Sequence, residues 1–406
     1  MNSKDKIKKL AQAHFGQFVK VRRHLHQHPE LSFNEHHTCA YVREQLLAIG
    51  ISEIESVAKT GLIATINGKT SGKTILLRAD MDALPIQEEN EVEYASQNPG
   101  IMHACGHDVH MTSLLLTAKI LWELRKFFSG TVKLLFQPGE ELMPGGATLV
   151  MKETSYKAMG SIPHLGQHVM PNLPAGKVGF RSGLFMASMD EIYITIIGKG
   201  GHAAVPEECI DPILIASHVI VAAQQVVSRM ASPKTPSVLS FGRIIGDGAN
   251  NVIPDKVIIE GTFRTYDEAW RTEAIEKLTK MVKSIAEGMG AECLVDIPRG
   301  YPHLKNNPEL TNAMKLSAME YLGAKNVVDL DLWMAAEDFA FYSQQNQACF
   351  YLLGVGNTEK GITSGLHGWL WSHCFKRKIS FVGTTYSPVF LQLSPVLGLK
   401  RLQQHR

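Results

Sequence analysis

The sequence lacks a long hydrophobic run. No stretch of its 406 residues approaches the roughly 18 consecutive apolar residues of a membrane span, so we expect no membrane partner. The N-terminus has no apolar segment of roughly 7–15 residues before a small-residue cleavage site, which predicts no signal peptide and a cytoplasmic location by default. An excess of one charge is also missing, since 41 Lys and Arg face 39 Asp and Glu. This balance argues against nucleic acid as a partner.

Cysteine and, at one end, acidic residues are scarce. The six cysteines are scattered, and in a long chain of this kind free thiols are expected rather than disulfides. Residues 368–406 contain no Asp or Glu and six Lys or Arg. Because this basic tail carries no recognisable nucleic-acid-binding motif, we interpret it as a solvated surface.

What the chain does contain is a regular alternation of apolar patterns. Up to about residue 184, predicted helices alternate with predicted strands, which indicates an α/β domain. Residues 185–300 follow the order β-α-β-β-α-β of a ferredoxin-like α+β unit. We therefore predict an α/β domain formed by residues 1–184 and 301–406, with an inserted domain at 185–300. The predicted helices cover 4–28, 34–49, 111–128, 211–230 and 267–289, and the predicted strands cover 61–67, 73–78, 131–136, 190–197, 237–245, 256–265 and 292–297.

The densest cluster of reactive side chains lies in residues 102–110. Cys105 and His107 stand two apart in a glycine-containing stretch, which we expect to form a loop before a helix. Such a loop can turn a thiolate and an imidazole toward one ion. These ligand types suit Zn²⁺, Co²⁺ or Ni²⁺, whereas Mn²⁺ usually prefers oxygen ligands. The alternative is a buried free thiol with surface histidines.

Two further clusters follow predicted strands. Glu140 and Glu141 come after a Pro-Gly turn, and adjacent side chains usually point apart, which favours two roles: one carboxylate binds metal while the other takes a proton from water. Asp82 follows the strand 73–78, where an Asp can orient a metal-bound histidine. The carboxyl ends of strands are where α/β proteins place their sites. The alternatives are solvated carboxylates and a turn-forming Asp.

Several motifs in order resemble the M20 amidohydrolases, the group that includes hippurate hydrolase, auxin-conjugate hydrolases and N-acyl-amino-acid amidohydrolases. The resemblance extends over roughly residues 15 to 367. The segments that carry it are 23–35, 77–86, 103–108, 136–141, 198–204, 251–255, 261–265 and 337–340.

The resemblance implies a zinc-peptidase-like catalytic domain and an inserted lid and dimerisation domain. It implies two divalent ions (Mn, Zn, Co or Ni), a small N-acyl amino acid as substrate, and a homodimer or higher homo-oligomer. Glu140 would be the general base and Asp82 the site-orienting carboxylate. The implied ligands are Cys105, His107, Glu141, His168 and His367, and the implied substrate-binding residues are His202, Asn251 and Arg264.

The sequence departs from the family pattern after His367, where the usual acidic stretch and final helix are missing. A lineage-specific ending or a shifted reading frame would explain this, and His373 is a possible substitute ligand. Two alternatives remain. In one, Cys105 is a nucleophile, which would leave the Glu140–Glu141 pair without a task. In the other, the altered tail makes the protein a catalytically impaired binding or interaction module.

Overall fold

A computed structural model describes residues 3–357, and residues 1, 2 and 358–406 lie outside that description. The described residues form two compact units. Unit 1 comprises 3–183, 305–331 and 341–357, and unit 2 comprises 184–304 and 332–340. The chain passes between the units at the short strands β7 (Gly183–Met186) and β14 (Leu304–Asn306), and again at residues 331–332 and 340–341.

Unit 1 is built on a mixed sheet of eight strands in the order β1-β2-β4-β3-β5-β16-β6-β15. The central strands β4, β3, β5 and β16 run parallel, and their carboxyl-side halves in β3 and β4 and most of β5 and β16 are buried. Near-continuous apolar runs are what a strand covered on both faces requires. The strands are β1 (Ile54–Val57), β2 (Gly61–Asn67), β3 (Thr70–Asp80), β4 (Ser129–Gln137), β5 (His164–Pro174), β6 (Val178–Phe180), β15 (Val327–Asp329) and β16 (Ala348–Gly356).

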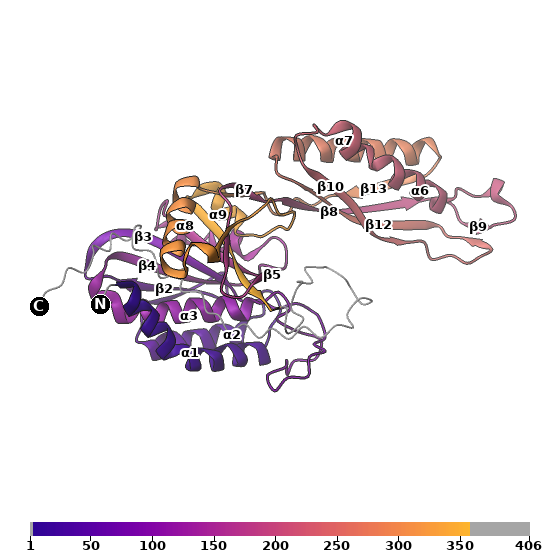
Figure 1. The fold of residues 1–406 in the computed structure, drawn as a ribbon. Coiled ribbons are helices and arrows are strands. Elements are labelled where there is room, and N and C mark those ends of the chain that lie inside the picture. Colours follow the sequence, from indigo (N-terminus) through magenta and orange to yellow (C-terminus); the bar gives the residue numbers. More distant parts are fainter. Residues whose placement is uncertain (1–2, 358–406) are drawn as a thin grey trace, which may run out of the picture. The chain divides into compact units, whose positions relative to one another are not determined.

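Helices cover both faces of this sheet. Figure 1 shows α1, α2 and α3 along one face and α8 and α9 along the other. The helix α3 is buried nearly all round, as its apolar sequence predicts. The helices are α1 (Ser3–Gln27), α2 (His36–Ile49), α3 (His107–Leu124), α4 (Gly146–Val150), α5 (Thr154–Lys157), α8 (Pro308–Leu322) and α9 (Ala340–Gln345), with short 3₁₀ turns η1 (Arg125–Phe127) and η4 (Ala324–Asn326).

The α3 boundary corrects a prediction. The expected helix began at residue 111, with Cys105 and His107 together in a loop. The helix instead begins at His107, after Gly106 with φ of 89°. A left-handed residue of this kind favours glycine, and it lets the chain turn sharply between the two side chains. Cys105 therefore lies in the loop, whereas His107 lies in the first helical turn.

Unit 2 has a four-stranded antiparallel sheet in the order β10-β12-β8-β13, with α6 and α7 on one face (Figure 1). Its strands and helices follow the predicted β-α-β-β-α-β order, which with this sheet order is the ferredoxin-like arrangement. The elements are β8 (Ser188–Ile197), α6 (Pro212–Ala223), β10 (Ser237–Ile245), β12 (Lys256–Thr265), α7 (Glu268–Gly288) and β13 (Glu292–Asp296), with β9 (Gly201–His202), β11 (Val252–Ile253), the 3₁₀ turn η2 (Pro206–Glu208) and the π-helical turn η3 (Val226–Met230).

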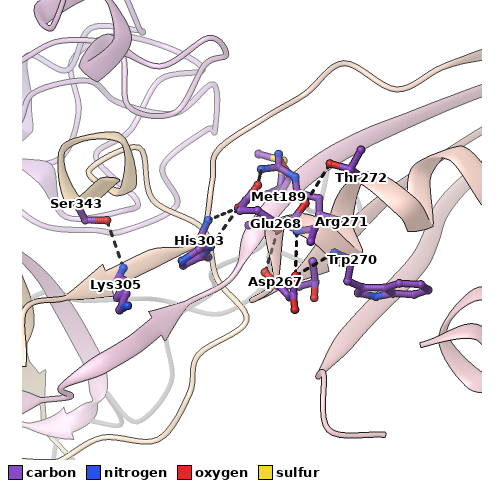
Figure 2. A network of polar contacts seen from close by, with 12 residues as sticks. Met189, Asp267, Glu268, Trp270, Arg271, Thr272, His303, Lys305 and Ser343 are labelled. Atoms are coloured by element: carbon purple, nitrogen blue, oxygen red, sulfur yellow. Dashed lines mark hydrogen bonds and ion pairs between the residues drawn. The ribbon is translucent and has the colours of Figure 1, made fainter. Parts of the chain in front are cut away.

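A cluster of charges around the buried Arg271–Asp190 pair secures unit 2 near the point where the chain leaves it (Figure 2). The Arg271 guanidinium donates to both carboxylate oxygens of Asp190, at 2.7 and 2.5 Å, and to Glu268 at 2.9 Å. Asp190 also accepts from the backbone N–H of Gly300, and Glu268 accepts from the backbone N–H of His303. The cluster therefore ties the start of α7 to β8 and to the departing segment.

The helical stretch Pro212–Met230 corrects the expectation about apolar runs. Among the described residues it is long and apolar enough to span a membrane by length and composition alone. Its side chains Ile215, Val219 and Val226 nevertheless pack into the core of unit 2. A helix that packs on a sheet with one face meets the same criterion, so this stretch is weak evidence for a membrane. Asp211 caps the helix by accepting from the backbone N–H groups of Ile213 and Leu214.

Candidate metal centre

Three parallel strands bring the polar side chains of unit 1 to one edge of its sheet. Asp80, the last residue of β3, pairs in register with Gln137, the last residue of β4. Leu77 of β3 pairs with Leu165 of β5, so three residues further on Asp80 is level with His168. Segments far apart in the sequence thus end side by side, where ligands of α/β proteins bind.

The thiol of Cys105 and the imidazoles of His107 and His168 converge at this edge. One ligand atom from each lies within 4.8 Å of the other two. The Cys105 Sγ lies 3.2 Å from His168 Nε2. His168 donates from Nδ1 to the carbonyl of Val169 at 2.7 Å, which leaves the Nε2 lone pair directed toward the cluster. In metal-binding histidines, a hydrogen bond from the ring nitrogen that does not bind the metal sets the tautomer.

Glu140 and Glu141 join the same cluster through His107, again within 4.8 Å. The two adjacent carboxylates converge, and the expectation that they point apart is wrong. The reason is that the chain has left β4 at Gln137 and turned through Gly139, which has φ of 63°. Glu140 is buried and Glu141 is partly exposed, which is a difference in environment between the two neighbours.

Asp82 lies under the cluster and contacts two of its members. Its Oδ1 lies 3.4 Å from His107 Nδ1. Its Oδ2 accepts from the backbone N–H of Glu141 at 2.9 Å and from the Ser32 hydroxyl at 2.6 Å. One fully buried carboxylate therefore holds the loop that carries the Glu pair by a hydrogen bond, and it lies against the imidazole without a well-directed hydrogen bond to it.

The electrostatics of the cluster suit a cation. Burial would lower the pKa of His107, but Asp80 and Asp82 raise it to about 10. Burial raises the pKa of Glu141 to about 7, against the pull of His107. Burial, and then the carboxylates of Glu141 and Glu140, raise the pKa of the Cys105 thiol. The raised pKa values mean that Cys105, His107 and Glu141 tend to retain protons, and a divalent ion can displace protons from such ligands.

The ligand atoms of the cluster also suit a cation. Among the residues that the structure describes, both ring nitrogens of His107, the Oδ1 of Asp82 and the Oε1 of Glu141 are buried without a hydrogen-bond partner. Buried polar atoms are rarely left in this state without an ion or water to satisfy them. Thiolate, imidazole and carboxylate together form a donor set for a borderline divalent metal.

The predicted substrate residues lie in unit 2. His202 and Asn251 are brought together where β9 pairs with β11, and the backbone N–H of Ala203 donates to the Asn251 carbonyl. His202 Nδ1 accepts from the backbone N–H of Ala204 at 3.1 Å, which leaves Nε2 as the donor of the neutral ring. Arg264 lies apart on β12, half-buried, and donates to the Met334 carbonyl. His367 and His373 lie outside the described residues.

The sequence analysis assigned no role to two residues of the cluster. Asp80 and His110 are fully buried, and each offers an atom within 4.8 Å of His107. His110 stands three residues after His107 on α3, so the two rings share one helix face. That spacing was available in the sequence, but it became informative only once the helix was known to begin at His107.

Comparison with known proteins gives the family. Residues 76–383 match peptidase family M20/M25/M40. The chain is 42% identical over 307 residues to an N-acyl-L-amino acid amidohydrolase of Geobacillus stearothermophilus, covering 76% of this chain and 82% of that one. It is 38% identical over 353 residues to an N-acetyl-L-cysteine deacetylase of Bacillus subtilis, covering 87% and 82%.

A solved structure agrees. The YXEP protein of Bacillus subtilis, described as a dinuclear metal binding peptidase from the M20 family, is similar with a TM-score of 0.75 and 33% identity, covering 96% of this chain and 100% of that one. The predicted fold class, an α/β protein of the zinc-peptidase type, is thereby confirmed. The chain is a hydrolase that acts on amides, and it belongs to peptidase family M20/M25/M40.

Proposed function

We propose that this protein hydrolyses the amide bond of N-acyl amino acids and releases a carboxylic acid and a free amino acid, using two divalent ions. The observation that carries the proposal is the convergence of Cys105, His107 and His168 with the Glu140–Glu141 pair, with ligand atoms left unpartnered at His107 and Glu141. The names of the relatives support an acylated amino acid as the substrate class.

Five residues would hold the ions: Cys105, His107, Glu141 and His168 from the described cluster, and His367 beyond it. Mn, Zn, Co or Ni would satisfy this donor set. When bound, such ions polarise a carbonyl and lower the pKa of a water molecule toward neutrality. Asp82 would hold His107 and the Glu141 backbone in place through the contacts already described.

Glu140 is the proposed proton carrier. It would accept a proton from the attacking water as the new C–O bond forms, and it would return that proton to the amide nitrogen as the C–N bond breaks. His202 would donate from Nε2 to the developing oxyanion, an interaction typically worth about 2.7–4 kcal/mol for one donor. Asn251 and Arg264 would hold the carboxylate of the amino-acid part.

The test is Glu140→Gln in the full-length protein, assayed on a series of N-acyl amino acids with Mn²⁺, Zn²⁺, Co²⁺ and Ni²⁺ supplied separately. We expect the wild type to hydrolyse members of the series. We expect the variant to retain its metal and to lose turnover by about 100-fold or more, since proton transfer by a positioned group contributes roughly that much. Glu123→Gln, at a partly exposed pair with Lys119, serves as the matched control. Near-normal turnover in Glu140→Gln would contradict the role.

The thiol-nucleophile alternative gains one observation, the 3.2 Å contact between Cys105 and His168. A catalytic cysteine, however, requires a lowered thiol pKa. Burial and the neighbouring carboxylates act in the opposite direction here. Treatment with EDTA separates the two, because a thiol enzyme survives the chelator and a metal-dependent one does not. The described residues and the family assignment lend no support to a catalytically impaired binding module.

We also propose that unit 2 forms a homodimer interface and acts as the lid. Its helix α6 leaves Ile213, Leu214 and Val221 exposed, with 75% of Val221 accessible, while the opposite side of the helix is buried. The edge strand β10 has one free side in the four-stranded sheet. Val221→Lys should lower the apparent mass in sedimentation from dimer to monomer, and an unchanged mass would exclude α6 as the interface.

A further inference from the structure

His110 is a buried histidine whose two ring nitrogens are both engaged. Its Nδ1 lies 2.6 Å from Asp80 Oδ1, and its Nε2 accepts from the backbone N–H of Val169 at 2.9 Å. A backbone N–H can only donate, so Nε2 must be the unprotonated nitrogen. The ring proton therefore resides on Nδ1, where the Asp80 carboxylate accepts it.

The residue that His110 holds is the one that orients His168. Val169 donates its N–H to His110, and its carbonyl accepts from His168 Nδ1. The Val169 side chain also packs closely against Gly106. A Cβ added to this glycine would lie only 2.6 Å from Val169 Cγ2. A single residue of β5 is thus fixed by α3 on one side and fixes the His168 imidazole on the other.

The far side of His110 is anchored equally firmly. Asp80 accepts from Arg78 through its other oxygen, at 2.6 Å. Arg78 in turn donates to Gln137, which also accepts from the Tyr342 hydroxyl. All of these side chains are fully buried in unit 1. The chain of contacts joins β3, β4 and α9 to the ring of His110.

We propose that His110 is a positioning residue, which holds the Val169 backbone and thereby keeps His168 Nε2 directed at the metal. The inference rests on the proposed metal-dependent function and names a residue to which that function assigns no role. The competing interpretation is that His110 is itself a metal ligand, in a site formed with Asp80 and His107. Each of these three residues offers an atom within 4.8 Å of the others. To bind an ion, His110 would have to abandon Asp80 or Val169, and Asp80 is already neutralised by Arg78.

The experiment uses two substitutions, each of which keeps only one of the two hydrogen bonds of the His110 ring. In His110→Asn the shorter amide can still donate to Asp80 but cannot reach Val169. In His110→Gln the longer amide can accept from Val169. We expect the Asn variant to bind Zn²⁺ about 10–100-fold more weakly, in competition with a chromophoric chelator, and the Gln variant to retain most of the affinity. His164→Gln, at a buried histidine of β5 that contacts Tyr156 and Ile162, is the matched control.

The unfolding temperature of each metal-free variant distinguishes a positioning role from a merely structural one. A merely structural role predicts that both variants unfold at lower temperature while their Zn²⁺ affinity is unchanged. Should the Asn variant fail to fold, ¹⁵N-histidine NMR of the wild type decides. The proposal requires His110 to keep its Nδ1–H tautomer when Zn²⁺ is added, and loss of that tautomer overturns it. Equal Zn²⁺ affinity in wild type and both variants also overturns the proposal. A wild type that binds Zn²⁺ but cleaves no N-acyl amino acid contradicts the proposed function instead.

Discussion

The two units each contain a buried cluster of charges, and the clusters are organised in opposite ways. In unit 2, Asp190 receives two hydrogen bonds from Arg271 and a third from Gly300, and Glu268 is held by Arg271 and His303. In unit 1, four carboxylates surround His107, and atoms of Asp82, His107 and Glu141 lack hydrogen-bond partners within the described chain.

The difference distinguishes charges that are paired with one another and stabilise a fold from charges whose unpaired atoms are available to a ligand. A buried charge is tolerable when it is paired and hydrogen-bonded, and the cluster of unit 2 meets that condition. A cluster with unsatisfied lone pairs costs stability and is retained where function needs it. Breaking each cluster should therefore have opposite consequences for metal binding and for stability.

The largest effect is expected from Glu141→Gln. Removing a proposed direct ligand should weaken Zn²⁺ binding by more than the roughly 10–100-fold typical of outer contacts. The metal-free protein should unfold at the same or a higher temperature, because the substitution removes a carboxylate close to Asp82 and other acids. Chelator competition and calorimetry measure the two quantities. A clear loss of metal-free stability would show that the cluster of unit 1 also supports the fold.

Arg271→Met should give the reverse result. The variant leaves Asp190 as a buried charge without its cation, which typically costs about 3–5 kcal/mol of unfolding free energy. Zn²⁺ affinity should not change. Arg243→Met, at an exposed pair with Glu260, is the control, and it should cost less than about 1 kcal/mol. Equal losses from both arginines in urea unfolding would contradict the contrast between a buried and a surface pair.

Gly146→Ala should disturb the cluster of unit 1 through its backbone. A Cβ at Gly146 would lie 1.6 Å from the carbonyl oxygen of Pro138, so the loop that carries Glu140 and Glu141 must move. A displacement of about 1 Å at a reacting group can cost 100-fold in rate. Gly16→Ala, in open space on α1, should leave activity unchanged. Wild-type turnover in Gly146→Ala would mean that the Glu pair tolerates such a shift.

Much of this contrast could be anticipated from the sequence, and the reason is local. The strands β2, β10 and β12 occupy the predicted residues, because apolar alternation and flanking turn residues determine them. Cys105 and His107 were visible as a short motif before a predicted helix, and the Glu pair was visible as a short motif after a predicted strand. Only the composition of the cluster could be predicted, since the roles of these residues are chemical and remain proposals.

The rest depends on contacts between distant segments. No local pattern indicates that Val169 lies between His110 and His168, because the register of β5 against β3 decides it. Asp80 was passed over for a similar reason: the strand runs two residues further than its apolar core, so Asp80 ends β3 rather than following it. Likewise, Asp190 and Arg271 are 81 residues apart and read as ordinary surface charges in the sequence.

The smallest effect is expected when the pH is lowered. It tests whether the charge of Glu268 in the unit 2 cluster stabilises the fold. Burial alone would raise the pKa of Glu268, but hydrogen bonds from His303 and the charge of Arg271 lower it to about 2. The unfolded value is about 4.3, so the stabilisation is complete above that pH and declines as the pH falls toward 2. Glu268→Gln should therefore be less stable than the wild type at pH 6, and the difference should shrink between pH 4.5 and 3. The side chain is partly exposed, which keeps the effect small. Urea unfolding of both proteins across this range gives the comparison, and a difference that grows with acid would mean that the Glu268 charge opposes folding.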